Sequence, residues 1–248
     1  MKRIYHAFAV LAIITLTPSL KIGDELVRNG GFELIDGKLN TWDQLPAAFG
    51  WSNVNLGLSE VFSKDASRKS VGIPVNDYGT MEPKEGEHYA GFFAWKDDVK
   101  RNWGAGGNDD PFEPGWNVYS EYIQSELVTP LMEDHTYELS FWVALSGNSD
   151  RAVSGLGAYC SSFAMKEQNR RFLQERPVAF SDDILNKKSE WAEIKGTFVA
   201  DGGETHIIIG TYPYVGFETQ RMIKDYDNQY AYYYLDAITL KEVEPEQN

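Results

Sequence analysis

Short strand-like segments separated by turn residues recur along almost the whole chain, and they restrict it to an all-β fold. The clearest segment is 136–145 (TYELSFWVAL), in which apolar side chains at alternate positions fall on one face. These are Tyr137, Leu139, Phe141, Val143 and Leu145. The other strand-like segments are 88–95, 119–128, 156–163, 191–199, 206–212 and 232–243. Turn-forming clusters such as SGNSD and ADGG lie between them.

Many strands and almost no helical pattern predict a two-sheet antiparallel β-sandwich of the jelly-roll type. Segment 165–173 fits either a short helix or an extended loop, and 96–116 is predicted to be a long loop. We find no internal repeat and no low-complexity linker. We therefore expect one domain over residues 24–243, followed by a short acidic tail at 244–248.

The amino terminus has the pattern of a secretory signal. Lys2 and Arg3 precede an apolar run at 7–16, which is too short for a membrane span, and small residues follow it. We expect a signal peptide over 1–19, cleaved near Ser19; the alternative is a buried N-terminal strand or helix. The mature chain would then be exported, to the periplasm, the outer-membrane surface or the extracellular medium. We expect no transmembrane segment in it.

The net charge of the chain restricts the classes of partner, and its cysteine content restricts how the fold is stabilised. The formal net charge is −14, and loss of Lys2 and Arg3 with the signal takes it to −16. Such a chain repels phosphate backbones, which argues against nucleic-acid binding. A single cysteine, Cys160, allows no internal disulfide, and its apolar, strand-like surroundings predict a packed core thiol.

Several segments together resemble carbohydrate-binding modules of families 4, 9 and 22, within the galactose-binding-like jelly rolls. The resemblance rests on ELVRNGGFE at 25–33, TYELSFWVAL at 136–145, the stretch at 190–210 and YYLDAITL at 233–240. The middle segments are similar to jelly-roll modules of exported Bacteroidetes proteins. The resemblance spans nearly the whole mature chain, and it implies an antiparallel jelly roll.

The resemblance also implies a structural calcium ion, with Glu33, Asp236 and the carbonyl of Gly31 as ligands. Calcium binds carboxylate and carbonyl oxygens, so these residue types suit it. Asp236 lies between Leu235 and Ala237 in an apolar strand, where a bare carboxylate would be costly. An ion would remove that cost; the alternatives are an exposed edge position or a basic partner.

Exposed tryptophans are the candidate ligand-binding residues. Trp142 lies opposite the apolar series of its strand, on the expected concave face, while Trp95, Trp103 and Trp116 flank or lie in the long loop. Trp103 is surrounded by small and polar residues, which favours contact with a ligand; the alternative is that it pins the loop. Trp51 and Trp191 are predicted to be packing residues, and Trp42 stays undecided.

We find no catalytic motif: the acidic pairs are adjacent residues suited to turns, and the histidines lack metal-ligand spacing. The resulting hypothesis is a non-catalytic module that binds a polysaccharide or cell-envelope glycan. The first alternative is an envelope or surface subunit that binds a protein partner. The second is a glycoside hydrolase or polysaccharide lyase with an unrecognised site.

Overall fold

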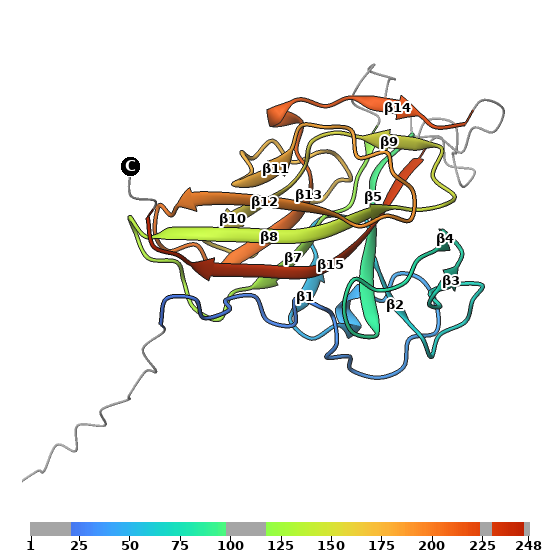
Figure 1. Ribbon diagram of the computed structural model, residues 1–248, viewed down its shortest axis with the longest axis horizontal. Helices are drawn as coiled ribbons and strands as arrows, with labels where there is room; N and C mark the ends of the chain where they lie inside the picture. The colour runs from blue at the N-terminus through green and yellow to red at the C-terminus, as the bar shows by residue number, and fades with distance from the viewer. Residues whose placement is uncertain (1–20, 98–117, 224–229, 246–248) are drawn as a thin grey trace, which may run out of the picture.

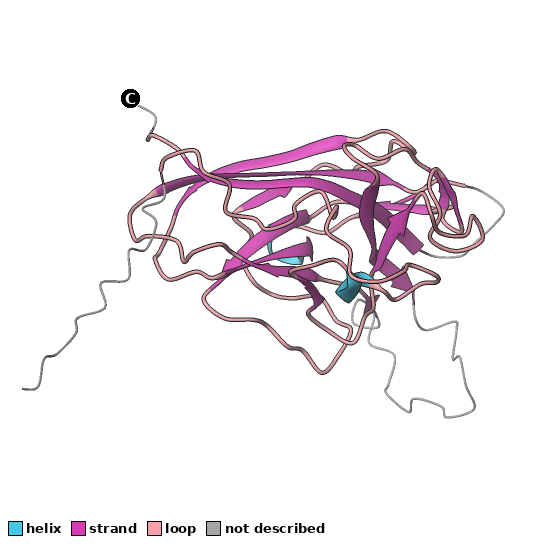
Figure 2. Ribbon diagram, turned by 90° about the horizontal axis from the view of Figure 1, so that it is seen from below, coloured by secondary structure: helices cyan, strands magenta, loops and turns pink. Residues whose placement is uncertain are grey.

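In a computed structural model, which describes residues 21–97, 118–223 and 230–245, the chain folds into two antiparallel sheets stacked as a sandwich (Figures 1 and 2). The larger sheet has the order β12-β8-β15-β5-β2, with β6 pairing with β5. Its strands are β12 (Ala192–Val199), β8 (Thr136–Leu145), β15 (Tyr230–Glu242), β5 (His88–Asp97), β2 (Glu60–Ser63) and β6 (Val118–Tyr119).

The smaller sheet has the order β1-β7-β13-β10-β11. Its strands are β1 (Trp51–Asn53), β7 (Ile123–Glu126), β13 (His206–Thr211), β10 (Leu156–Ser161) and β11 (Ala179–Ser181). Two short ribbons add β9 (Arg151–Val153) with β14 (Thr219–Arg221), and β3 (Val75–Asn76) with β4 (Gly79–Thr80). The helical content of the described residues is two short 3-10 turns, η1 (Leu45–Ala47) and η2 (Pro213–Val215). The predicted fold class is confirmed.

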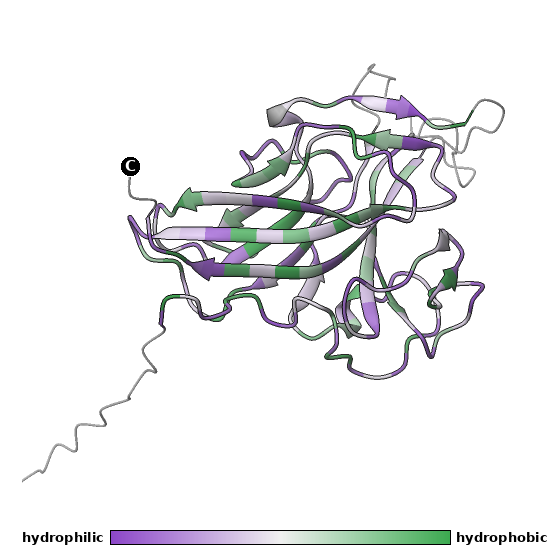
Figure 3. Cartoon of the chain, viewed as in Figure 1, coloured by the Kyte–Doolittle hydropathy of each residue, from purple (hydrophilic) through white to green (hydrophobic). Residues whose placement is uncertain are grey.

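The alternation along β8 is the pattern that builds the core. Its five apolar residues at odd-numbered positions, from Tyr137 to Leu145, are at most 2% exposed. Stripes of alternating hydropathy run along β8 and the neighbouring β15 (Figure 3). Cys160 is also buried in this core, and burial raises the pKa of its thiol, as expected of a packing residue.

One predicted strand is wrong. The segment 119–128 is not continuous: β6 pairs with β5 in the larger sheet, whereas β7 pairs with β1 and β13 in the smaller one. The chain crosses between the sheets at residues 120–122. The crossing places Glu121 at the end of the β5–β6 ladder, where its N–H donates to the carbonyl of Phe93.

Chain segments cover the outer faces of both sheets. Residues 74–88 cross the larger sheet, where Asn76 bonds to Tyr89 and Tyr234. Segment 165–173, which the sequence left open, has no regular secondary structure and packs on the smaller sheet. There Met165 and Gln124 exchange two hydrogen bonds of 2.9 Å, and Leu173 packs beside Tyr122 and Ile208. Both sheets are therefore partly buried on two sides.

Candidate functional site

Two buried carboxylates, Glu60 on β2 and Glu121 at the crossing point, lie beneath a group of aromatic rings. Glu60 accepts hydrogen bonds from the hydroxyls of Tyr78 (3.0 Å) and Tyr232 (2.6 Å). Glu121 accepts from the Tyr119 hydroxyl and, at 2.9 Å, from the backbone N–H of Phe93. Both glutamates are at most 2% exposed. Tyrosine hydroxyls, rather than cations, therefore provide most of the hydrogen bonds to these two carboxyl groups.

Burial raises the pKa of both carboxyl groups. The pKa of Glu60 is raised well above its ordinary value, first by burial and then by the charge of Glu121, although the tyrosine hydrogen bonds oppose this. Burial likewise raises the pKa of Glu121. The pair therefore favours protonated or proton-sharing states at neutral pH.

Five aromatic residues form what we call the aromatic cluster: Tyr78, Phe93, Tyr119, Tyr230 and Tyr232. The rings of Tyr119, Tyr230, Tyr232 and Tyr78 meet that of Phe93 edge-on, with centroids 5.0–5.7 Å apart. Edge-to-face packing of this kind is the favoured arrangement for aromatic pairs. The set combines buried members with half-buried ones, Phe93, Tyr119 and Tyr230, that reach the surface.

Basic groups border the half-buried rings. The Lys96 ammonium lies 4.7 Å from the centroid of Phe93 and 5.3 Å from that of Tyr119. The Arg170 guanidinium lies 5.2 Å from the centroid of Tyr119. Partly exposed rings with cations at their border can bind a polar molecule that has an apolar face.

The predicted concave-face residue, Trp142, lies elsewhere on the same outer face. It is half-buried on β8, opposite Asp236 of β15, and the Lys84 ammonium lies 3.5 Å from its ring centroid. Beside it, the Ser140 hydroxyl donates to Glu193 at 2.6 Å. Segment 74–88 contacts both regions, because its Lys84 lies over Trp142 and its Tyr78 belongs to the aromatic cluster.

The other tryptophans have different surroundings. Trp95 is half-buried at the end of β5 and packs against the core, while Trp103 and Trp116 lie outside the described residues. Trp51 is 3% exposed in the core, and Trp191 packs against the core and donates to the carbonyl of Glu82. Trp42, undecided from the sequence, is exposed. Of the four predicted ligand-binding tryptophans, only Trp95 and Trp142 thus lie within the described residues.

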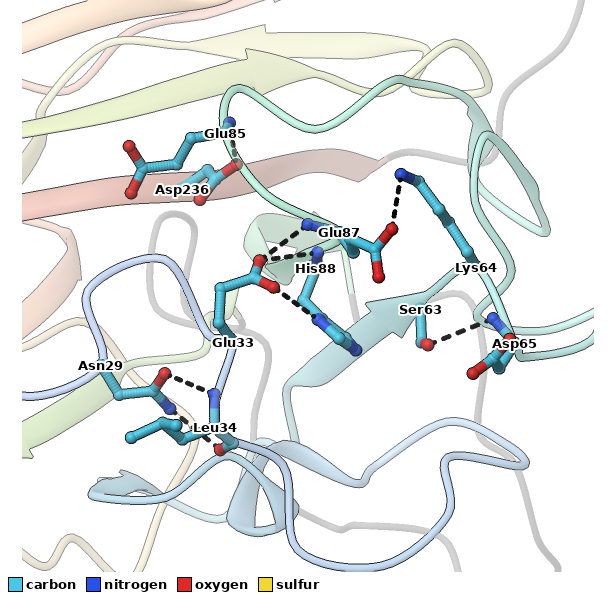
Figure 4. Close-up of polar contacts among 10 residues, drawn as sticks. All are labelled: Asn29, Glu33, Leu34, Ser63, Lys64, Asp65, Glu85, Glu87, His88 and Asp236. Atoms are coloured by element: carbon cyan, nitrogen blue, oxygen red, sulfur yellow. Dashed lines mark hydrogen bonds and ion pairs between the residues drawn. The ribbon is translucent and has the colours of Figure 1, made fainter.

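The predicted calcium ligands Glu33 and Asp236 both bind the loop at 84–88 (Figure 4). One oxygen of Glu33 accepts the N–H groups of Glu87 (2.8 Å) and His88 (3.0 Å), and its other oxygen lies 3.2 Å from Nδ1 of His88. One oxygen of Asp236 accepts from Lys84 (2.8 Å) and Glu85 (3.1 Å). Backbone amides therefore stabilise both carboxylates.

Burial raises the pKa of Asp236 to about 7, against the lowering effect of these amides, and the charge of Glu85 raises it further. Glu85 also reaches Gly31, since a Cβ added to that glycine would lie 2.8 Å from Oε1 of Glu85. Even so, in the described residues no three His, Cys, Asp or Glu side chains come together as metal ligands.

The sequence analysis missed the acid pair and the aromatic cluster. One signal was present in the sequence. Tyr119 and Glu121 are two residues apart, and residues two apart on a strand share a face. Phe93 likewise shares a face with the residues two positions from it on its strand. The pairing of Lys96 with Tyr119 and of Tyr232 with Phe93 brings these rings together. That register depends on pairing between segments, so it cannot be predicted from any one segment alone.

Comparisons with known proteins give similarity at the level of folds. No family model matches the chain, and no curated protein matches it. Among solved structures, it is similar to the CBM22-1 xylan-binding domain of Xyn10C from Paenibacillus barcinonensis, with 13% identity, 92% of this chain and 99% of that one covered, and a TM-score of 0.43.

Two further solved structures match with comparable identity and TM-score. The CBM22-1–CBM22-2 tandem domain of the same Paenibacillus protein matches with 13% identity, 91% and 48% coverage and a TM-score of 0.46. The K1 cleaved adhesin domain of Lys-gingipain from Porphyromonas gingivalis W83 matches with 13% identity, 88% and 98% coverage and a TM-score of 0.40.

Proposed function

We propose that this chain is a non-catalytic carbohydrate-binding module, and that it binds a polysaccharide or cell-envelope glycan at the aromatic cluster. The observation that carries the proposal is the set of half-buried rings of Phe93, Tyr119 and Tyr230, bordered by Lys96 and Arg170. Sugar rings have apolar faces that stack on aromatic side chains and hydroxyls that bond to polar groups. A surface that offers both suits such a ligand.

The acid pair supports a binding role rather than a hydrolytic one. Glycoside hydrolysis needs two carboxyl groups that flank the scissile bond and reach the substrate. Glu60 and Glu121 are at most 2% exposed and are bonded to tyrosine hydroxyls and a backbone amide. Their arrangement stabilises the base of the aromatic cluster.

The proposal extends to export and to a structural calcium ion. Export, to the periplasm, the outer-membrane surface or the medium, is supported by the pattern of residues 1–19, which lie outside the described range. No described helix has the length and hydrophobicity needed to cross a membrane. Calcium at Glu33, Asp236 and the Gly31 carbonyl is supported by the buried Asp236 and the nearby Glu85. When bound, the ion would neutralise these carboxylates.

A polysaccharide panel tests the proposal, with affinity electrophoresis or pulldown of the protein in the presence of calcium. Phe93→Ala removes the central ring of the cluster, and Trp103→Ala tests the tryptophan predicted from the sequence to contact a ligand. Phe180→Ala is the matched control, because Phe180 is a 43% exposed ring on β11 of the other sheet.

Three outcomes separate the alternatives. Binding that Phe93→Ala reduces at least tenfold, and Phe180→Ala leaves unchanged, supports the aromatic cluster as the site. Binding that survives both loop and cluster variants moves the site to Trp142. Absence of binding to every glycan contradicts the proposal and favours an envelope protein as the partner.

A further inference from the structure

A cavity of about 370 Å³ lies at the edge of the sandwich, between the loop at 183–190 and the strands β8 and β12. Its floor consists of apolar side chains from both strands and the loop: Val143, Leu145, Ile184, Leu185 and Ala192. Val143 and Leu145 are also members of the main core. The cavity is therefore an opening onto the core, and its volume is within the usual range for small-molecule sites, roughly 300–1,000 Å³.

The loop at 183–190, which lines one side of this cavity, is attached to the sandwich at both ends. The carbonyl of Leu185 accepts from the Tyr233 hydroxyl at 2.7 Å, and its N–H donates to Val153 at 3.2 Å. At the other side, the N–H of Ser189 donates to the carbonyl of Leu145 at 3.0 Å. Lys188 adds a bond of 2.8 Å to the carbonyl of Gly147. The cavity is thus preformed, and a ligand need not order the loop.

The charges at the rim leave an excess carboxylate. Lys187 is paired with Glu190 at 2.9 Å, so these two charges neutralise each other. The Asp183 side chain lines the same rim, and no hydrogen bond or ion pair is found for its carboxylate among the described residues. The chain as a whole carries a net charge of −14, which favours an approaching cation.

We propose that this cavity binds a small amphiphilic cation, an alkyl or aryl amine, whose apolar body packs on the half-buried Ile184, Leu185 and Ala192 and whose ammonium pairs with Asp183. An apolar floor provides the burial, and the single unpaired carboxylate selects the charge. This site lies apart from the aromatic cluster and does not depend on carbohydrate binding.

Three probes that share a phenyl ring and differ in charge test the proposal: 2-phenylethylamine, 2-phenylethanol and 3-phenylpropionate. Each is titrated into the protein, and methyl NMR signals of Val143, Leu145, Ile184 and Leu185 are followed. We expect the amine to shift these signals and to bind up to about fivefold more tightly than the alcohol, as one exposed ion pair allows.

Asp183→Asn and Asp182→Asn form the matched pair of variants. Both residues are exposed, but only Asp183 lines the cavity. We expect Asp183→Asn to remove the preference for the amine over the alcohol, and Asp182→Asn to keep it. No methyl shift with any probe would overturn the site. A preference that both variants reduce equally would overturn the role of Asp183 and indicate unspecific attraction to an acidic surface.

Discussion

The ring of Tyr78 stacks on that of Tyr232, with centroids 3.7 Å apart and planes 5° from parallel, and both hydroxyls donate to the same carboxylate, Glu60. Tyr78 belongs to the segment that covers the larger sheet, and Tyr232 belongs to its β15 strand. Glu60 therefore joins the cover to the sheet through two hydrogen bonds.

Removing either hydroxyl should destabilise the protein. Tyr78→Phe and Tyr232→Phe each take one donor from a buried acid, which costs about 1–3 kcal/mol. Because the two donors share Glu60, we expect the double variant to deviate from the sum by more than about 0.5 kcal/mol. Urea denaturation measures all three, with Tyr214→Phe, 60% exposed, as the control. Strict additivity would contradict the shared carboxylate.

Stability should fall as the pH rises above about 5. The pKa of Glu60 is raised from its ordinary 4.5, so the fold favours the neutral acid. The stabilisation is complete below 4.5 and is lost as the pH rises towards the folded-state pKa. In the absence of calcium, Asp236, whose pKa is raised from 3.8 to about 7, contributes in the same direction between those two values.

Melting temperatures between pH 5 and pH 9 test this expectation. Glu60→Gln keeps the shape of the side chain and cannot ionise, so its melting temperature should depend less on pH than that of the native chain. Glu133→Gln makes the same substitution at an exposed position and serves as the control. Equal slopes for the two variants would show that net charge, rather than the buried acid, sets the pH dependence.

Long alternating segments allowed the sandwich to be predicted. The shorter elements could not be predicted from their pattern. The ten residues of β8 show the period of two over five repeats, whereas β3 and β4 have two residues each, too few to show a period. The segment 119–128 was predicted as one strand, although residues 120–122 change sheets. Periodicity reports which side chains are buried and not which sheet they join.

The candidate site depended on contacts between distant segments. Glu60 and Glu121 are far apart in the chain, and strand pairing of β2 and β6 with β5 brings them together. Glu33 and Asp236 were predicted to meet through the family resemblance; the structure brings both to the loop at 84–88. The sequence could not show that this loop offers backbone N–H groups to both carboxylates.

Removal of calcium should lower the melting temperature if the proposed ion is bound. A site saturated at about 100 times its dissociation constant adds roughly 2.7 kcal/mol, or about 5–10 °C for a chain of this size. We expect the native chain to lose this amount in EDTA, and Glu33→Gln to lose much less. Glu87→Gln is the control, because Glu87 is a nearby carboxylate that pairs with Lys64 at 3.3 Å and is not a predicted calcium ligand. A melt that EDTA does not change would contradict the calcium proposal.

A substitution at Gly86 tests the contact between Glu33 and the loop at 84–88. Its φ of +62° lies in the left-handed region, and a Cβ there would collide with Oε1 of Glu33. Gly203 also has a positive φ, +87°, but a Cβ there would meet nothing within 4 Å. Alanine at either position pays the left-handed strain, roughly 1 kcal/mol, and only Gly86→Ala also displaces Glu33.

We therefore expect Gly86→Ala to reduce the free energy of unfolding by at least about 1 kcal/mol more than Gly203→Ala, because it breaks hydrogen bonds to a carboxylate. In a Glu33→Ala background the collision is absent, and the two glycine substitutions should then cost the same. Urea denaturation of the two substitutions in both backgrounds measures this. Equal costs in the native background would mean that Glu33 does not hold the loop, and that Asp236 alone anchors it.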